Sequence, residues 1–264
     1  RSMVRIRLRA PSYAGPLSLI FLSSVQLSHT VFITGASRGL GLELTRQFLK
    51  AGSYVFATAR EPKSEALQSL KLEYGNQLQL LVLDVTDNGQ ISKAATRLAR
   101  KPLNLLINNA GLFTDNPFVG DPEEDPLNIV DSDQWLTVFR VNTIAPFLIA
   151  RALKTNLKIT DQSAVVMISA MMGSLTNNQS GGAYSYRSSK AALNAVTASL
   201  AIDLAVDDTK VVALHPGWLQ TDMGGRGAPM DTSTSAKALK AVMLNLEEVP
   251  TGSFLDYTGT PIPW

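Results

Sequence analysis

The sequence of 264 residues predicts an α/β fold in which a parallel, doubly wound β-sheet is covered by helices on both faces. Two observations lead to this fold class. The apolar run 31–33 leads through a glycine-rich turn into residues 42–49, which are apolar at helical spacing. Further apolar runs follow, and 103–107 is apolar throughout, as expected of a strand covered on both faces. We expect residues 30–264 to form one domain, because about 250 residues is a common size for an α/β domain.

The glycine-rich turn at 34–41 reads Thr-Gly-Ala-Ser-Arg-Gly-Leu-Gly, and its position between a strand and a helix is typical of nucleotide binding. Its glycines allow a tight turn, close approach of the backbone to a pyrophosphate, and close packing of helix on sheet. The phosphates would sit at the helix N-terminus, where N–H groups and the dipole favour anions. An ordinary βα turn is the alternative for a glycine triplet considered alone. The expected cofactor contacts are Gly35, Ser37, Arg38, Gly39, Leu40 and Gly41.

The second strand is expected at 54–59, and the residue that follows it bears on the choice of cofactor. An NAD-binding domain of this type usually has an acid there, which binds the ribose 2′-hydroxyl. This chain has Arg60 instead, and Arg38 lies in the glycine turn. Either arginine alone would more often be a surface residue. Together, two guanidinium groups at these places favour a 2′-phosphate, and therefore NADP (NADPH) over NAD.

The remaining strands are expected at apolar runs further along the chain, namely 78–83, 103–107, 164–169, 211–214 and an edge strand at 252–257. Residues 113–133 carry three prolines and seven acids, so they cannot be helical throughout. They are interpreted as a solvated loop, with a rim over a substrate mouth as the functional alternative. A long helix is expected from about 132 to 153, with the polar residue Asn142 in an apolar stretch.

Tyr186 and Lys190 are four residues apart in a predicted helix, so they share one helix face. A free phenol titrates at about 10, which is too high for efficient proton exchange at neutral pH. A neighbouring ammonium favours the phenolate and lowers that pKa, so Tyr186 can give a proton to an oxygen or take one from it. The pattern Y-x-x-x-K is common by chance, and its weight comes from following the glycine turn in the same chain.

Four motifs in order resemble the short-chain dehydrogenase/reductase family over residues 30–264: the glycine turn, Asn-Asn-Ala-Gly at 108–111, Tyr186 with Lys190, and Pro-Gly at 216–217. The surroundings of Tyr186, the segment 215–225 and the ending 259–264 resemble the carbonyl-reductase branch of the sniffer and C-factor type. The resemblance implies a Rossmann fold with a seven-stranded parallel sheet of order 3-2-1-4-5-6-7. It also implies hydride transfer between NADP(H) and a carbonyl or secondary alcohol, in a homodimer or homotetramer.

The same resemblance implies roles for individual residues. Tyr186 would be the general acid, and Lys190 would bind the nicotinamide ribose and tune Tyr186. Asn142 would kink its helix and hold a water near Lys190, and Asp84 would accept a hydrogen bond from the adenine amino group. The further cofactor contacts that it implies are Val85, Asn109, Ala110, Gly111, Pro216, Gly217, Trp218 and Thr221.

One position departs from the family pattern S-S-x-x-G, whose second serine usually binds the substrate carbonyl. Here the stretch 169–173 reads Ser-Ala-Met-Met-Gly, so that position holds Ala170. Ser169 is one residue earlier, and adjacent side chains of a strand face opposite ways. We keep Ser169 as a catalytic candidate but predict that it does not fully replace the missing group. The alternative function is a weakly active or inactive NADP-binding sensor or interaction protein.

Composition excludes several other classes of site. The chain has no cysteine, which excludes disulfides, thiolate catalysis and cysteine-based zinc sites, and its two histidines, His29 and His215, are too far apart in sequence to suggest a metal site. Of 24 basic residues four are arginines within 1–29, which leaves 20 bases against 22 acids in the rest of the chain. This balance gives no basic field for nucleic acid.

Residues 1–29 are expected to be an N-terminal extension rather than part of the domain. They contain arginines and serines but no acid, with an apolar run from 17 to 27 that resembles a mitochondrial presequence or a signal-peptide core. The run is too short for a confident transmembrane helix, so no stable membrane insertion is expected. An extension packed on the domain, or loosely tethered to it, is the other interpretation. We expect a cytoplasmic protein, with a mitochondrial location as the alternative.

Overall fold

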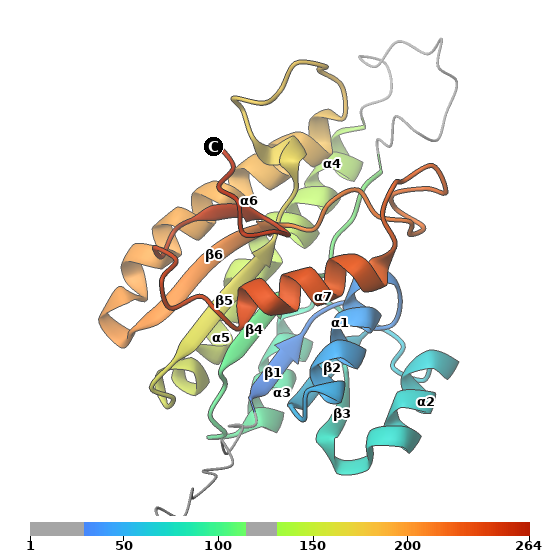
Figure 1. Cartoon of the computed structure of the whole chain (residues 1–264), viewed down its shortest axis with the longest axis vertical. Coiled ribbons are helices and arrows are strands. Elements are labelled where there is room, and N and C mark those ends of the chain that lie inside the picture. The colour runs from blue at the N-terminus through green and yellow to red at the C-terminus, as the bar shows by residue number, and fades with distance from the viewer. Residues whose placement is uncertain (1–28, 115–130) are drawn as a thin grey trace, which may run out of the picture.

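The structure is a computed structural model that describes residues 29–114 and 131–264. Its seven strands form one sheet in the order β3-β2-β1-β4-β5-β6-β7, and every neighbouring pair is parallel (Figure 1). The strands are β1 Thr30–Ile33, β2 Tyr54–Ala59, β3 Leu78–Val82, β4 Leu105–Asn108, β5 Ser163–Ile168, β6 Thr209–His215 and β7 Phe254–Asp256. This order confirms the predicted fold class.

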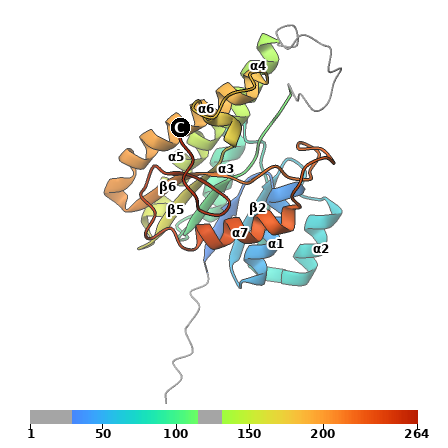
Figure 2. The ribbon, with the colours of Figure 1, turned by 45° about the horizontal axis from the view of Figure 1, so that its top comes forward.

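Helices cover both faces of the sheet (Figure 2). On one face lie α1 Gly39–Lys50, α2 Glu65–Tyr74 and α7 Thr232–Met243. On the other lie α3 Asn88–Leu98, α5 Ala145–Lys158 and α6 Tyr184–Asp203. The shorter elements are α4 Ser132–Phe139, the π-helical turn η2 Arg140–Ile144, and the 3-10 turns η1 Gly75–Gln77, η3 Met171–Gly173 and η4 Ala205–Asp207.

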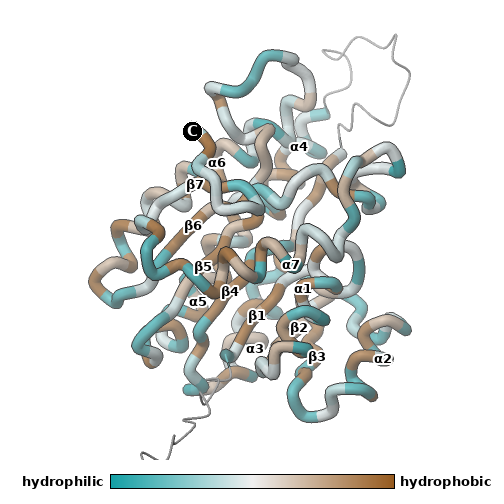
Figure 3. The backbone as a smooth tube through the Cα atoms, viewed as in Figure 1, coloured by the Kyte–Doolittle hydropathy of each residue, from teal (hydrophilic) through white to brown (hydrophobic). Residues whose placement is uncertain are grey.

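Side chains of the central strands alternate between two separate cores. Val31 and Ile33 of β1 are buried under α1 and α7, whereas Phe32 is buried on the face of α3 and α5. Because both faces are covered, the central strands β4 and β5 are buried along their whole length and are mostly apolar, whereas the edge strand β3 has the exposed residues Gln79 and Val82. The central strands are among the most hydrophobic stretches of the backbone (Figure 3).

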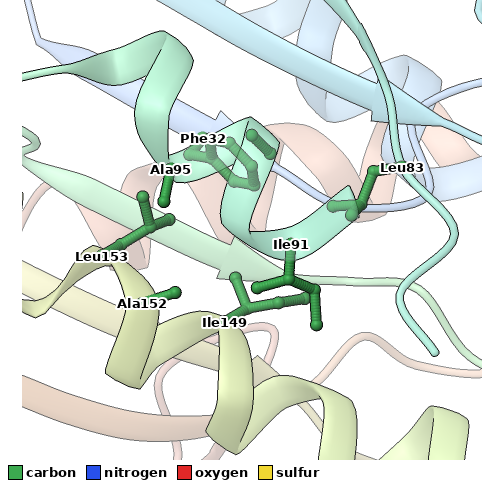
Figure 4. A pocket seen from close by; sticks show the side chains of 8 residues that line it. Phe32, Leu83, Ile91, Ala95, Ile149, Ala152 and Leu153 are labelled. Atoms are coloured by element: carbon green, nitrogen blue, oxygen red, sulfur yellow. The ribbon is translucent and has the colours of Figure 1, made fainter. Parts of the chain in front are cut away.

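A gap between α3 and α5 is lined by apolar side chains alone, including Phe32, Ile91, Ile149 and Leu153 (Figure 4). It is too tight to admit a water molecule. No side chain there offers a polar group to a ligand, so we interpret the gap as an irregularity of core packing rather than a binding site.

The structure shifts several predicted boundaries. The strand predicted at 54–59 is β2, but the one predicted at 103–107 is β4 at Leu105–Asn108, and β5 ends at Ile168, one residue before Ser169. The predicted long helix is continuous from α4 through η2 to α5. Most of the loop predicted at 113–133 lies outside the described residues, as does all but His29 of the predicted N-terminal extension.

The run Ser132–Lys158 is long and apolar enough to cross a membrane by length and composition alone. In the fold it is a core element, since Ile149, Leu153 and Leu157 of α5 are buried against the sheet. Core helices of proteins without a membrane span have the same composition, and packing against the sheet accounts for the apolar residues on the buried face of α5.

Candidate active site

The glycine turn lies against the end of β4 so closely that two of its glycines can carry no side chain. Gly35 has a φ of 68°, and a Cβ added there would lie 2.9 Å from the Cα of Ala110. A Cβ on Gly41 would lie 2.3 Å from the carbonyl oxygen of Gly35. The turn therefore has the backbone surface that the sequence predicts for phosphate binding.

Thr34 and Asn109 hold this turn to the end of β4. The Nδ2 of Asn109 donates to the carbonyl oxygens of Thr34 at 2.9 Å and Gly35 at 3.1 Å. In return, the Thr34 hydroxyl oxygen accepts from the backbone N–H groups of Asn109 at 2.9 Å and Ala110 at 3.0 Å. The side chain of Asn109, together with the backbone N–H groups of Asn109 and Ala110, thus fixes the cradle to the end of β4.

The start of α1 fits an anionic ligand. Its N-cap residue is Arg38, whose side chain does not cap the helix, and the first turn of any α-helix presents N–H groups without helical partners. The guanidinium of Arg38 forms an ion pair with Asp222, with Nη1 and Oδ2 2.7 Å apart. Arg60 is exposed directly after β2, on the strand that neighbours β1.

Asp84 follows β3 at the same edge of the sheet, beside the buried Val85. Its Oδ1 accepts hydrogen bonds from the backbone N–H and the hydroxyl of Thr86. These two bonds hold the pKa of Asp84 below its usual value. The carboxylate is therefore ionised at neutral pH and available as an acceptor, as the predicted contact with adenine requires.

Tyr186 and Lys190 lie on the buried face of α6. The Lys190 ammonium donates to the carbonyl oxygen of Ile168 at 2.7 Å and lies 5.7 Å from the centre of the Tyr186 ring. Burial lowers the pKa of Lys190 from 10.5 to about 8. Phe113 stacks on the Tyr186 ring with the two centroids 4.3 Å apart. The structure thus brings together the predicted proton donor and its predicted cation.

Three residues with left-handed backbone precede α6, namely Gly181, Gly182 and Ala183, with φ of 62°, 63° and 47°. Such a conformation is unfavourable by about 1–2 kcal/mol for a residue with a Cβ, so Ala183 is held there by its surroundings. The Arg187 guanidinium supports the turn, since it donates to the Gly181 carbonyl oxygen at 3.1 Å. The start of the helix, and with it the position of Tyr186, is therefore fixed.

Asn142 lies in the π-helical turn η2 and is fully buried. Its Oδ1 accepts from the N–H of Leu112 at 2.8 Å, and its Nδ2 donates to the carbonyl oxygen of Leu112 at 2.8 Å and to the Ser189 hydroxyl at 3.0 Å. The irregular turn agrees with the expected kink. The side chain links the segment after β4 to the helix that carries Tyr186.

The Ser169 hydroxyl is directed into the core rather than left available to a substrate. It donates to the Oδ1 of Asn194 in α6 at 2.7 Å, and Ser169 is almost fully buried. A hydroxyl has one proton, so while it donates to Asn194 it cannot donate to a carbonyl. Ala170 follows in extended backbone with no donor on its side chain.

The connection from β6 to α7 contains the other predicted cofactor residues. The Pro216 carbonyl oxygen accepts from the Ser235 hydroxyl, and Gly217 has a φ of 87°. The Trp218 indole N–H donates to the carbonyl oxygen of Gly224 at 2.8 Å. Thr221 lies beside the glycine turn, since its Cγ2 would be 3.4 Å from a Cβ added to Gly39. These residues are placed at the same edge of the sheet as the cradle.

His215 ends β6 beside Asp256 of β7. Burial lowers its pKa to about 4, so the imidazole is neutral at physiological pH. Within residues 29–114 and 131–264, no group of three or more His, Cys, Asp and Glu side chains could hold a metal ion.

Comparison with known proteins agrees with this geometry. A family model described as short chain dehydrogenase matches residues 29–231. The chain belongs to the short-chain dehydrogenase family. The chain is therefore an oxidoreductase by family, and the solved structures that it resembles include carbonyl reductases.

Three relatives illustrate where in the family this short-chain dehydrogenase lies. It is 37% identical over 170 residues to the C-signal protein of Myxococcus xanthus, a match that spans 64% of this chain and 98% of that one. It superposes on carbonyl reductase Sniffer of D. melanogaster with a TM-score of 0.82 at 32% identity, over 90% and 100% of the two chains. An NADPH-bound carbonyl reductase from chicken fatty liver gives 0.81 at 34% identity, over 90% and 99%.

Several residues that shape the site in this short-chain dehydrogenase were missed at the level of sequence. Ser189 and Asn194 lie on the face of α6 that carries Tyr186 and Lys190, so helical spacing was a usable signal. Asp222 had no such signal, because its partner is 184 positions away in the chain.

Proposed function

We propose that the protein uses NADPH to reduce a carbonyl compound, with Tyr186 as the general acid. The observation that carries this proposal is the buried pair of Tyr186 and Lys190 at the sheet edge that holds the glycine cradle. The NADPH-bound chicken carbonyl reductase, which is similar over nearly the whole of both chains, supports the same cofactor here.

The residues present fit a dinucleotide. The turn at Gly35 and Gly41 would hold the pyrophosphate at the N-terminus of α1, and Arg38 with Arg60 would bind a 2′-phosphate. When bound, the nicotinamide supplies hydride to the carbonyl carbon. The remaining task for the protein is to position the carbonyl and deliver a proton to its oxygen.

Lys190 makes proton delivery by Tyr186 feasible at neutral pH. Its ammonium lies near the tyrosine ring within a buried region, where the attraction between opposite charges is stronger than in water. A cation at this place favours the phenolate form of Tyr186, which is the form left after the phenol has given its proton to the substrate oxygen. The lysine stays charged at pH 7, because its own pKa is about 8.

The carbonyl oxygen of the substrate would receive one hydrogen bond fewer here than in proteins with the family pattern S-S-x-x-G. Ala170 offers no donor, and the Ser169 hydroxyl is committed to Asn194. A preorganised donor at such a position is worth about 3–4 kcal/mol in comparable sites. We therefore expect weak turnover on simple carbonyls, and this observation favours a second candidate function, an NADP-binding sensor or interaction protein with little turnover.

A single-turnover experiment separates the two functions. NADPH oxidation would be followed across a panel of aldehydes and ketones for wild type, Tyr186→Phe and the control Tyr184→Phe, together with NADPH binding for each. A reductase shows oxidation that Tyr186→Phe abolishes with NADPH affinity within about threefold, because the hydroxyl serves proton transfer more than binding. NADPH binding with no oxidation by wild type would support the sensor. Loss of activity in Tyr184→Phe alone would mean that the wrong tyrosine is assigned.

We also propose that the protein forms a homo-oligomer through the run from α4 to α5. Three large apolar side chains are exposed along this run, namely Leu136, Ile144 and Phe147. Light scattering should detect a dimer or tetramer that Phe147→Glu dissociates. Leu72→Glu, at an exposed position of α2, is the control that leaves the mass unchanged. A monomeric wild type would contradict this proposal.

A further inference from the structure

The ion pair of Arg38 and Asp222 joins the glycine turn to the connection between β6 and α7. Its atoms are 2.7 Å apart, and the two side chains are 74% and 75% exposed. Next to it, Thr221 touches the turn as well, since a Cβ added to Gly39 would lie 3.4 Å from the Cγ2 of Thr221. The connection therefore rests on the residues that would hold the phosphates.

The next residue, Met223, extends this contact toward the end of β4. A Cβ added to Gly111 would lie 3.8 Å from the Cε of Met223. Thr221, Asp222 and Met223 thus lie beside Gly39, Arg38 and Gly111 of the predicted cradle, respectively. The segment therefore borders the place that a cofactor would occupy, and Asp222 lies at the arginine that would meet a 2′-phosphate.

The segment belongs to a compact lobe, residues 218–225, that is braced by its own hydrogen bonds. The N–H of Gly224 donates to the Thr221 hydroxyl at 3.1 Å, and the N–H of Gly225 donates to the Thr221 carbonyl oxygen at 2.9 Å. A Cβ on Gly224 would lie 2.1 Å from the carbonyl oxygen of Leu219, which leaves no room for a side chain. Among the ion pairs of the described residues, only that of Arg38 and Asp222 ties this lobe to the rest of the chain.

We propose that Asp222 is a specificity-determining residue whose carboxylate competes with the cofactor 2′-phosphate for Arg38. This inference rests on the proposed binding of NADPH. A 2′-phosphate needs the guanidinium of Arg38, and a carboxylate beside it repels the phosphate. NADH lacks that phosphate and therefore does not compete with Asp222 for Arg38. Asp222 therefore weakens binding of NADPH and leaves binding of NADH unaffected.

The test is equilibrium binding by calorimetry for wild type, Asp222→Asn and a charge-matched control. Asp161→Asn removes the same charge at an exposed position before β5, at the opposite end of the strands. The ligands are NADPH, NADH and 2′,5′-ADP, which has the phosphate but no nicotinamide. Asp222→Asn should bind NADPH and 2′,5′-ADP about two- to fivefold more tightly, the range expected for an exposed ion pair. NADH affinity and the control should not change, and high salt should reduce the difference.

Different results overturn different claims. If wild type binds NADPH but Asp222→Asn binds it no better, or changes NADPH and NADH affinities equally, the role of Asp222 is refuted and the proposed function stands. If wild type binds neither NADPH nor 2′,5′-ADP, the cofactor assignment fails and the role of Asp222 fails with it. Circular dichroism checks that each variant is folded, which we expect because both side chains are exposed.

Discussion

Burial of the Lys190 ammonium opposes folding, and the effect can be measured through its pH dependence. The pKa of Lys190 falls from 10.5 to about 8 on folding, which corresponds to about 3 kcal/mol against the charged form. Below pH 8 the lysine is charged in both states, and the folded state bears the full penalty. Between pH 8 and 10.5 the unfolded chain binds more protons than the folded one, so the free energy of unfolding rises with pH.

Lys190→Met removes this titration and keeps an unbranched apolar side chain. At neutral pH we expect the cofactor-free variant to be more stable than wild type by about 1–2 kcal/mol. The gain is smaller than the penalty of about 3 kcal/mol because the Ile168 carbonyl oxygen loses its hydrogen-bond partner, which costs about 1–3 kcal/mol. As pH rises to about 10, wild type should recover about 2–3 kcal/mol of unfolding free energy relative to the variant.

Urea denaturation of both proteins from about pH 7 to 10 gives the difference directly, since other titrating groups contribute equally to each. Lys237→Met, at an exposed position of α7, is the control and should show a difference from wild type that is flat with pH. A flat difference for Lys190→Met as well would refute the reasoning. So would a variant that is clearly less stable than wild type at pH 7.

Three further predictions concern binding, catalysis and positioning. Arg60→Ala should weaken NADPH binding by about 10- to 100-fold in a fluorescence titration and leave NADH within about threefold; equal wild-type affinities for the two cofactors would contradict the assignment of NADP. Ala170→Ser should raise kcat about tenfold by adding a donor to the carbonyl oxygen, while Ser169→Ala keeps most of the activity, and the reverse pattern would make Ser169 the donor. Asn142→Ala removes the three hydrogen bonds of a buried side chain and should lower both the free energy of unfolding, by about 2–4 kcal/mol, and kcat. Asn156→Ala removes the two hydrogen bonds of another buried side chain, far from the site, and should destabilise the fold without changing kcat; an equal fall in kcat would argue against a positioning role for Asn142.

The sheet was predictable because a parallel strand buried on both faces is apolar along its length, and such runs are visible in sequence. The residues at which strands begin and end were not predictable in the same way. Leu103 is fully buried and apolar like a strand residue, but its N–H donates to the carbonyl oxygen of Asn156, and β4 begins only at Leu105. Hydropathy reports burial, whereas a strand boundary depends on which partner each N–H finds.

Within the site, local patterns were informative and distant pairings were not. Tyr186 and Lys190 are four residues apart, so helix geometry alone puts them on one face. The bonds of Asn142 to Leu112 and the ion pair of Arg38 with Asp222 connect residues 30 and 184 positions apart. No periodicity predicts such contacts, which arise only when the chain has folded.

The two faces of the sheet have separate hydrophobic cores, so substitutions in one core have little effect on the packing of the other. The cradle rests on α1, which packs with α7 around Phe48 on one face. The tyrosine helix α6 packs through Leu193 on the other face. Substitutions on opposite faces share few neighbours, and the effects of distant substitutions usually add. In related proteins, substitutions beneath α1 can therefore change cofactor affinity while substitutions around α6 change proton transfer. Little epistasis is expected between the two sets.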